Sequence, residues 1–167
     1  MKNDHISYIG IGSNLGDRFG HIRRATNLLR NCSNVKSLKM APIYETEPVD
    51  CPDSNLFLNS VIELHYNQSE LDLFEDLKKI ESLFFREKHR KNGLREIDLD
   101  ILTFDDLVVD SEFLVIPHPR MHLREFVLNP FSKINKNWIH PILNQSVNEL
   151  LMNAQEQEKT YEPFLPS

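Results

Sequence analysis

Cysteine is scarce in this chain of 167 residues, and its 2 cysteines, Cys32 and Cys51, form no Cys-x-x-Cys pair. No histidine lies near them at metal-ligand spacing, so we interpret both as free thiols. Long apolar runs are also missing. The first run begins at Ile6 and is soon broken by Gly10 and Gly12, which is typical of neither a signal peptide nor a membrane span. No later run approaches membrane length, so the sequence predicts a soluble, cytoplasmic protein.

The sequence lacks an excess of positive charge, because its formal net charge is -6 at pH 7. Proteins that bind nucleic acids or anionic membranes in a general way select a basic surface. We therefore expect neither a nucleic acid nor a membrane as a partner. An anionic ligand would have to be met by a local basic patch.

The common glycine-rich signatures of nucleotide binding are absent too. No Gly-Lys pair precedes a serine or threonine, which excludes a P-loop. Gly10, Gly12 and Gly16 come close to a dinucleotide fingerprint, but the third glycine stands one residue late. We interpret these glycines as part of a tight loop.

The apolar residues that are present, with 40% of the chain hydrophobic, suffice for one core and predict a single domain over residues 1–167. Their periodicity predicts strands at 6–11, 35–44, 57–64 and 97–101, a helix at 18–29, and a second helix that follows Ser69 and fails near Phe85. This order is that of a ferredoxin-like βαββαβ fold. We predict an α+β protein with three αβα layers, an appended hairpin and a C-terminal helical region.

Three segments are predicted to be irregular or only loosely attached. Residues 47–53 contain two prolines and two aspartates and should form a long exposed loop. Asp105 and Asp106 predict the turn of a hairpin that returns through residues 107–109. The last residues, 155–167, are polar and contain two prolines, so we expect a loosely attached tail.

A pair of carboxylates gives the first candidate site. Asp98 and Asp100 are two residues apart on one predicted strand, so both side chains project from the same face, with Cα atoms roughly 6 to 7 Å apart. Oxygen ligands without a paired His or Cys favour Mg²⁺ over Zn²⁺. A strand with one solvated acidic face gives the same pattern, so the pair alone leaves both interpretations open.

Cationic residues cluster just before this pair in an otherwise acidic chain. They could hold phosphate oxygens while the carboxylates hold a metal ion, which is the division of labour in phosphoryl transfer. A solvated charge run after a helix is the alternative, and we prefer it for Arg90 and Lys91. The cluster consists of Arg86, Lys88, His89, Arg90, Lys91 and Arg95.

Aromatic and polar residues elsewhere are compatible with a flat heterocyclic ligand. Phe57 and Asn59 share one face at the beginning of their strand. His118 lies between two prolines and could bind phosphate or stabilise a turn. Arg124 and Phe126 could orient and stack a heterocycle, although Phe126 could equally belong to the core.

Five motifs together resemble the hydroxymethyldihydropterin pyrophosphokinase family over residues 6–131. They occur in family order with near-family spacing. In this sequence they read Ile11-Gly12-Ser13-Asn14-Leu15-Gly16, Tyr44-Glu45-Thr46, Phe57-Leu58-Asn59, Arg95-Glu96-Ile97-Asp98-Leu99-Asp100-Ile101-Leu102 and Pro117-His118-Pro119-Arg120-Met121.

The resemblance implies a role for each matching residue. Asp98 and Asp100 would bind two Mg²⁺ ions with ATP and, with Arg86 and Arg95, would form the catalytic set. The implied pterin contacts are Phe57 and Phe126 by stacking, Asn59 by hydrogen bonds, and backbone groups around Thr46 and Val49. The implied ATP contacts are Lys78, Glu81, Arg86, Lys88, Arg95, Ile101, His118 and Arg124.

The resemblance also implies the reaction, in which the pterin hydroxymethyl oxygen attacks the β-phosphorus of ATP and AMP is released. The chain departs from the family pattern at Phe85, at residues 92–94 and at Glu96. Glu96 would share a strand face with Asp98 and Asp100, so we hypothesise that it assists metal binding or weakens ATP binding by repulsion. We expect a monomer whose partners are ATP and 6-hydroxymethyl-7,8-dihydropterin.

Two other functions remain open at this point. A palm-like nucleotidyltransferase also places an Asp-x-Asp pair on a ferredoxin-like sheet, but the acidic net charge argues against its acceptor groove. A small-molecule-binding module of the same fold without catalysis is the second alternative. Release of pyrophosphate would favour the first, and ligand binding without AMP formation would favour the second.

Overall fold

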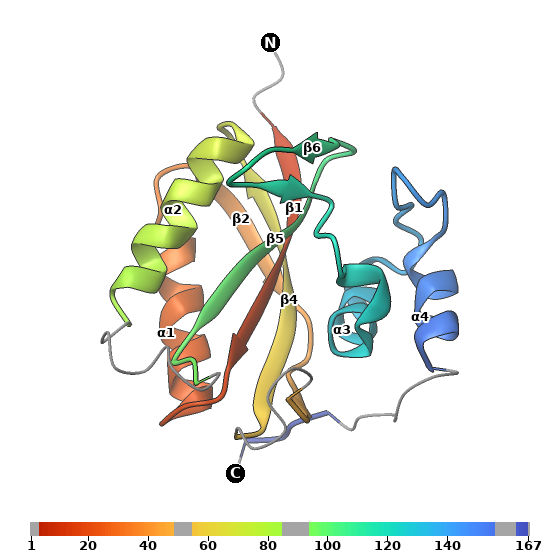
Figure 1. The fold of residues 1–167 in the computed structure, drawn as a ribbon. Coiled ribbons are helices and arrows are strands. Elements are labelled where there is room, and N and C mark those ends of the chain that lie inside the picture. The colour runs from red at the N-terminus through yellow and green to blue at the C-terminus, as the bar shows by residue number, and fades with distance from the viewer. Residues whose placement is uncertain (1–3, 49–54, 85–93, 156–162, 167) are drawn as a thin grey trace.

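An antiparallel sheet of five strands organises the molecule (Figure 1). The computed structural model describes residues 4–48, 55–84, 94–155 and 163–166. The strand order is β2-β4-β1-β5, and a short β3 also pairs with β4. These strands are β1 (His5–Ser13), β2 (Val35–Met40), β3 (Tyr44–Thr46), β4 (Phe57–Tyr66) and β5 (Asp98–Phe104). A separate hairpin pairs β6 (Val109–Asp110) with β7 (Val115–Ile116).

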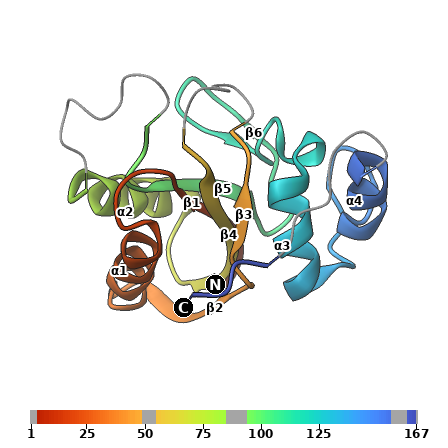
Figure 2. The same cartoon turned by 90° about the horizontal axis from the view of Figure 1, so that it is seen from below.

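Helices cover both faces of the sheet (Figure 2). The first pair, α1 (Arg18–Arg30) and α2 (Glu70–Ser82), lies on one face. On the other face α3 (Glu125–Asn135) packs on β4, and α4 (Val147–Gln155) packs against α3. The short 3-10 helix η3 (Met121–Leu123) precedes α3. This arrangement confirms the predicted α+β class with three layers and a C-terminal helical region.

Local sequence signals explain where the first two helices begin. The side chain of Asp17 accepts a hydrogen bond from the backbone N–H of Gly20 at 3.0 Å, which satisfies one of the free donors of the first turn of α1. Ser69 and Asp72 form a reciprocal capping box at the start of α2, as the sequence predicted.

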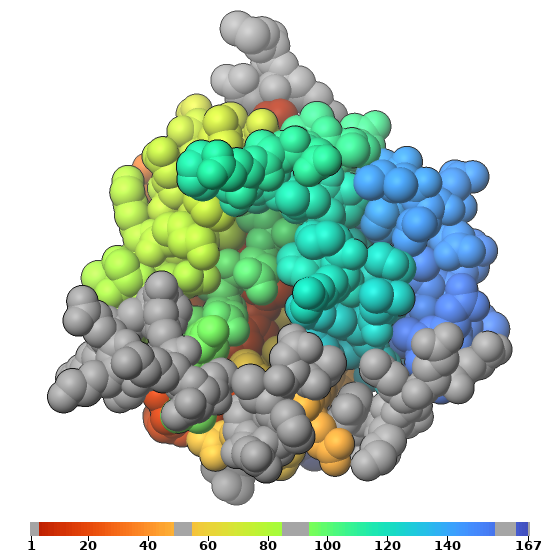
Figure 3. Space-filling model, in the orientation of Figure 1, coloured from red at the N-terminus to blue at the C-terminus, as the bar shows by residue number. Residues whose placement is uncertain are grey.

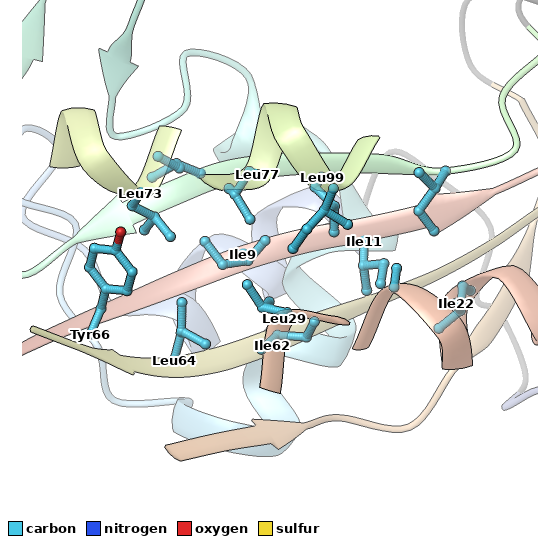
Figure 4. Close-up of a cluster of buried hydrophobic side chains, with 14 of the residues drawn as sticks. Ile9, Ile11, Ile22, Leu29, Ile62, Leu64, Tyr66, Leu73, Leu77 and Leu99 are labelled. Atoms are coloured by element: carbon cyan, nitrogen blue, oxygen red, sulfur yellow. The ribbon is translucent and has the colours of Figure 1, made fainter. Parts of the chain in front are cut away.

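Two hydrophobic clusters lie on the two faces of the sheet because neighbouring strand residues alternate between them. Ile9, Ile62 and Ile101 belong to the cluster beneath α1 and α2, whereas Tyr8, Val61 and Leu102 belong to the cluster beneath α3. Figure 4 shows Ile9, Ile11 and Ile62 facing Leu29 of α1 and Leu73 and Leu77 of α2.

The structure corrects two predicted elements. The predicted strand over 35–44 is interrupted after Met40. Pro42 has no N–H to donate to a neighbouring strand. The hydroxyl of Ser60 lies 3.0 Å from the carbonyl oxygens of both Ala41 and Pro42 and donates to them in place of a strand partner. The second correction concerns the position of the hairpin. The predicted turn at Asp105 and Asp106 is confirmed, and the backbone N–H of Leu107 donates to the carbonyl of Phe104 at 3.0 Å. Residues 105–108 lead out of β5, and the hairpin is formed instead by β6 and β7 around residues 111–114.

The end of the chain is more closely attached than predicted. Helix α4 extends to Gln155, and Pro163 forms an antiparallel bridge with Tyr44. The backbone N–H of Phe164 donates to the carbonyl of Ile43 at 2.6 Å, so residues 163 and 164 are held at the sheet. Cys32 is a free thiol as expected, and Cys51 lies outside the described residues. None of the described helices has the length and apolar composition needed to cross a bilayer.

Candidate active site

The first of two neighbouring hollows lies on the α3 face of the sheet and has a volume of about 240 Å³. Figure 3 shows this side of the molecule, with β5 visible in the depression between α2 and α3. Nine of the predicted site residues line this first cavity. They are Thr46, Phe57, Asn59, Arg95, Asp98, Asp100, His118, Arg124 and Phe126.

Glycines form the floor of the first cavity. Gly12 of β1 pairs with Asn59 on β4 and with Asp98 on β5, so the three residues form one row across the sheet. Gly10 lies opposite Asp100 in the same way. Because directly opposed residues project to the same face, the missing side chains leave space between the amide of Asn59 and the two carboxylates.

The Gly12 position also fixes Asn59. A Cβ atom at Gly12 would lie 2.5 Å from Oδ1 of Asn59, which no real contact permits. On the other side, Nδ2 of Asn59 donates to Oγ1 of Thr46 at 2.7 Å. The amide is therefore held between β1 and β3. Gly12 was predicted only to belong to a tight loop, and no local pattern in the sequence indicated this role.

The carboxylate pair has the electrostatics of a cation site. Asp98 and Asp100 both face the first cavity, as the alternation predicted. Burial and then the neighbouring charge of Asp100 raise the pKa of Asp98 to about 7, against the opposing effect of Arg95. Arg95 Nε lies 3.6 Å from Asp98 Oδ1. Two carboxylates on one face, with open space above them, suit a hard cation that keeps water and phosphate ligands.

No third protein ligand joins the pair among the residues that the structure describes, where no group of three His, Cys, Asp or Glu side chains is placed to hold a metal ion. Glu96 was expected on the same strand face, but β5 begins at Asp98 and Glu96 lies in a bend before it. Glu96 lines neither hollow. The proposed alignment of three carboxylates is therefore wrong.

Two cationic or proton-donating groups face the carboxylates from the segment before α3. The backbone N–H of Arg120 donates to Nδ1 of His118 at 3.1 Å, so Nε2 carries the proton of the neutral ring. Burial lowers the pKa of His118, which favours that neutral ring, although Asp100 opposes the shift. The guanidinium of Arg124 lies 5.4 Å from the ring centre of Phe126, within the range of a cation–π contact.

A second hollow, with a volume of about 300 Å³, adjoins the first between α2, β5 and the β6–β7 hairpin. Lys78 and Ile101 line it as predicted ATP contacts, and Asp100 and His118 line both hollows. Phe113 also lines it and is 77% exposed. Phe113 was not predicted as a site residue, because its position depends on how the hairpin folds against α2.

Glu81, which the resemblance assigns to ATP, contacts the strand that carries the carboxylate pair. Its carboxylate is buried, lines neither hollow, and accepts the backbone N–H of Leu99 at 2.9 Å. Its Oε2 pairs with Lys78 at 3.3 Å, and burial raises its pKa. Since Leu99 stands between Asp98 and Asp100, Glu81 connects α2 to the strand that carries the two carboxylates. Three other predicted contacts, Val49, Arg86 and Lys88, lie outside the described residues.

Comparison with known proteins decides the family. The family model described as 7,8-dihydro-6-hydroxymethylpterin-pyrophosphokinase (HPPK) matches residues 8–136. The chain belongs to the HPPK family. The family resemblance inferred from the five sequence motifs is thereby confirmed.

Individual relatives agree with the HPPK assignment. The chain is 40% identical over 131 residues to the 2-amino-4-hydroxy-6-hydroxymethyldihydropteridine pyrophosphokinase of Bacillus subtilis, covering 78% of each chain. It is 33% identical to the protein of the same name from Aquifex aeolicus, covering 94% of each. It is 38% identical to the folic acid synthesis protein fol1 of Schizosaccharomyces pombe, where the match covers 87% of this chain but only 20% of that longer protein.

A solved structure supports the HPPK fold. The Plasmodium falciparum HPPK-DHPS triple mutant superposes with a TM-score of 0.75 at 17% identity, covering 92% of this chain and 45% of that one. At this identity the likeness shows the fold alone. It agrees with the layered sheet and helices described above.

Proposed function

We propose that this chain transfers diphosphate from ATP to the hydroxymethyl group of 6-hydroxymethyl-7,8-dihydropterin, giving AMP and the pterin diphosphate in folate biosynthesis. The observation that carries the proposal is the junction of the two hollows. Asp100 and His118 line both, so a nucleotide in one and a heterocycle in the other would meet at the carboxylate pair. Family membership and the names of the relatives support the same reaction.

The first cavity would bind the pterin. Phe57 and Phe126 are half-buried aromatic residues in its lining, and a flat heterocycle between them would gain stacking contacts. Asn59 would hydrogen-bond the polar edge of the ring, helped by backbone groups at Thr46 and Val49. The glycine floor would let the ring lie close to the sheet.

The second hollow would bind the adenosine of ATP. Lys78, Ile101 and Phe113 offer a largely apolar surface beside the carboxylate pair. The triphosphate would run toward the first cavity, where Arg95, Arg124 and Nε2–H of His118 face inward. By family resemblance, Arg86 and Lys88 would also contact the phosphates. Glu81 would support this surface from below through Leu99.

Asp98 and Asp100 would hold two Mg²⁺ ions with ATP. The donor set fits, because two carboxylates face one cavity and a divalent cation prefers such oxygen ligands. Burial, and then the charge of Asp100, raise the pKa of Asp98, and a bound cation would favour the ionised form. When bound, the ions would neutralise phosphate charge and align the phosphates for attack.

The reaction then needs mainly positioning from the protein. A bond forms between the hydroxymethyl oxygen and the β-phosphorus, and the bond from that phosphorus to the α,β-bridging oxygen breaks. AMP leaves with the bridging oxygen, and the hydroxyl proton is released to solvent. Arg95 and His118 would stabilise the charge on the transferred and departing phosphates, and Asn59 would hold the acceptor in line. We propose that a monomer performs all of these steps.

Product analysis tests the function directly. The protein is mixed with ATP, Mg²⁺ and the pterin, and AMP and pterin diphosphate are separated by chromatography. We expect both products from the wild type and neither from an Asp98→Ala, Asp100→Ala double variant, with Asp98→Asn, Asp100→Asn as the matched control for side-chain shape. Pyrophosphate in place of AMP would support a nucleotidyltransferase. Pterin binding without any AMP would support a non-catalytic binding module.

A further inference from the structure

The last described residues return to the sheet beside the proposed pterin site. Pro163 bridges to Tyr44 in antiparallel fashion, and the N–H of Phe164 donates to the carbonyl of Ile43 at 2.6 Å. Figure 1 shows this C-terminal segment near the end of the sheet where β3 lies. The segment therefore lies along the edge of β3 that β4 does not occupy.

The Phe164 side chain anchors this segment. It is half-buried and packs against the cluster beneath α1 and α2, with its ring centre 6.4 Å from that of Phe19 in α1. Leu165, the next residue, is 84% exposed. The two adjacent apolar side chains thus differ sharply in burial, and of the two only Phe164 packs against the protein.

The strand beneath the segment is short and carries a site residue. Three residue pairs join β3 to β4, and an edge strand of this length has little stability of its own. Thr46 ends β3, lines the first cavity, and accepts the hydrogen bond from Asn59 at 2.7 Å. A shift of β3 would therefore turn the Asn59 amide out of its present orientation.

We propose that residues 163–166 form a strap that holds β3 in place, and that Phe164 is a positioning residue for the pterin through Thr46 and Asn59. The effect on the pterin rests on the proposed function. The nucleotide side would not depend on the strap, because Lys78, Ile101 and Asp100 belong to α2 and β5 and not to β3. Loosening the strap should therefore weaken binding of the pterin and leave binding of ATP unchanged.

The test compares Phe164→Ala with Leu165→Ala, two truncations of apolar side chains at neighbouring positions. For Phe164→Ala we expect KM for the pterin to rise about five- to tenfold, because binding must then pay for ordering β3. KM for ATP and kcat should stay within about twofold, and amide hydrogen exchange at Tyr44, Glu45 and Thr46 should accelerate. Leu165→Ala should match the wild type in every measurement, and Phe164→Leu should restore most of the pterin affinity.

Three results would overturn the strap. One is an unchanged pterin KM in Phe164→Ala with unchanged exchange in β3. Another is an equal rise in both KM values, which would mean general destabilisation, and the third is an equal effect of Leu165→Ala. If Phe164→Ala does not fold, Phe164→Val takes its place in the comparison with Leu165→Ala. If the wild type forms no AMP, the proposed function fails, while exchange in β3 still decides whether the segment holds that strand.

Discussion

At the scale of single residues, the site depends on the absence of a Cβ atom at Gly12. Gly12 separates Asn59 from Asp98 in one row of the sheet, and its lack of a side chain makes room for the amide oxygen of Asn59. The sequence pattern identified Asn59 and Asp98 individually. It could not place them in one row, because register between strands depends on pairing partners that are far apart in the chain.

Replacing Gly12 with alanine should impair the pterin side selectively. The new Cβ would meet Asn59 Oδ1 at 2.5 Å, so the amide must rotate and its hydrogen bond to Thr46 weakens. We expect KM for the pterin to rise about tenfold, while the free energy of unfolding falls by only about 1 kcal/mol, the usual net value of one hydrogen bond. In an Asn59→Ala background the same substitution should have little further effect. Additive effects of the two changes would contradict this mechanism.

Asp98 should make metal binding depend on pH near neutrality. Its pKa is raised to about 7, so without metal it is mostly protonated at pH 6 and mostly ionised at pH 8. A metal ion needs the ionised form, and affinity should therefore increase as pH rises, by about tenfold between these values. Titration with Mn²⁺ followed by electron paramagnetic resonance measures this without nucleotide. Asp98→Asn should bind more weakly and show no such dependence, and a flat wild-type profile would contradict the expectation.

At the scale of elements, the sequence predicted those whose apolar residues repeat regularly. Ile22, Ala25 and Leu29 are all buried in α1, and the capping residues of α2 could be identified from the sequence alone. Pro42 was a local signal for the interruption after Met40, but the sequence could not show that Ser60, 18 residues further along the chain, donates to the carbonyls of Ala41 and Pro42. The periodicity of residues 35–44 contains no information on the Ser60 hydroxyl, which hydrogen-bonds to their carbonyl groups.

Glu81 illustrates the same limit within the site. The family resemblance assigned it to ATP, and nothing in the sequence indicated that its carboxylate accepts a hydrogen bond from the backbone of Leu99 on β5. The bond connects α2 to the residue between Asp98 and Asp100. An element predicted correctly can thus present a functional side chain to a different neighbour, because the rotation of a helix on a sheet is decided by packing on the whole face.

At the scale of the molecule, the two hydrophobic clusters depend on the same strands. Tyr8 and Ile9 are adjacent on β1, but they belong to the clusters beneath α3 and beneath α1 and α2 respectively. Removing either helical layer would expose one entire face of the sheet to water. We therefore propose that the chain is a single cooperative domain, although α3 and α4 follow the ferredoxin-like core in sequence.

Unfolding monitored on both sides of the sheet tests that proposal. Trp138 is the only tryptophan in the sequence, and its ring centre lies 5.5 Å from that of Phe131 in α3, so its fluorescence reports on the α3–α4 side. Far-ultraviolet circular dichroism reports on all elements, and in urea the two signals should give the same midpoint.

Phe131→Ala should lower the free energy of unfolding by about 3 to 5 kcal/mol, and Leu29→Ala on the opposite face by about 2 to 5 kcal/mol. Because the clusters share β1, β4 and β5, each variant should shift both signals together. A fluorescence transition that precedes the circular dichroism transition, in Phe131→Ala alone, would instead identify α3 and α4 as a separately unfolding unit.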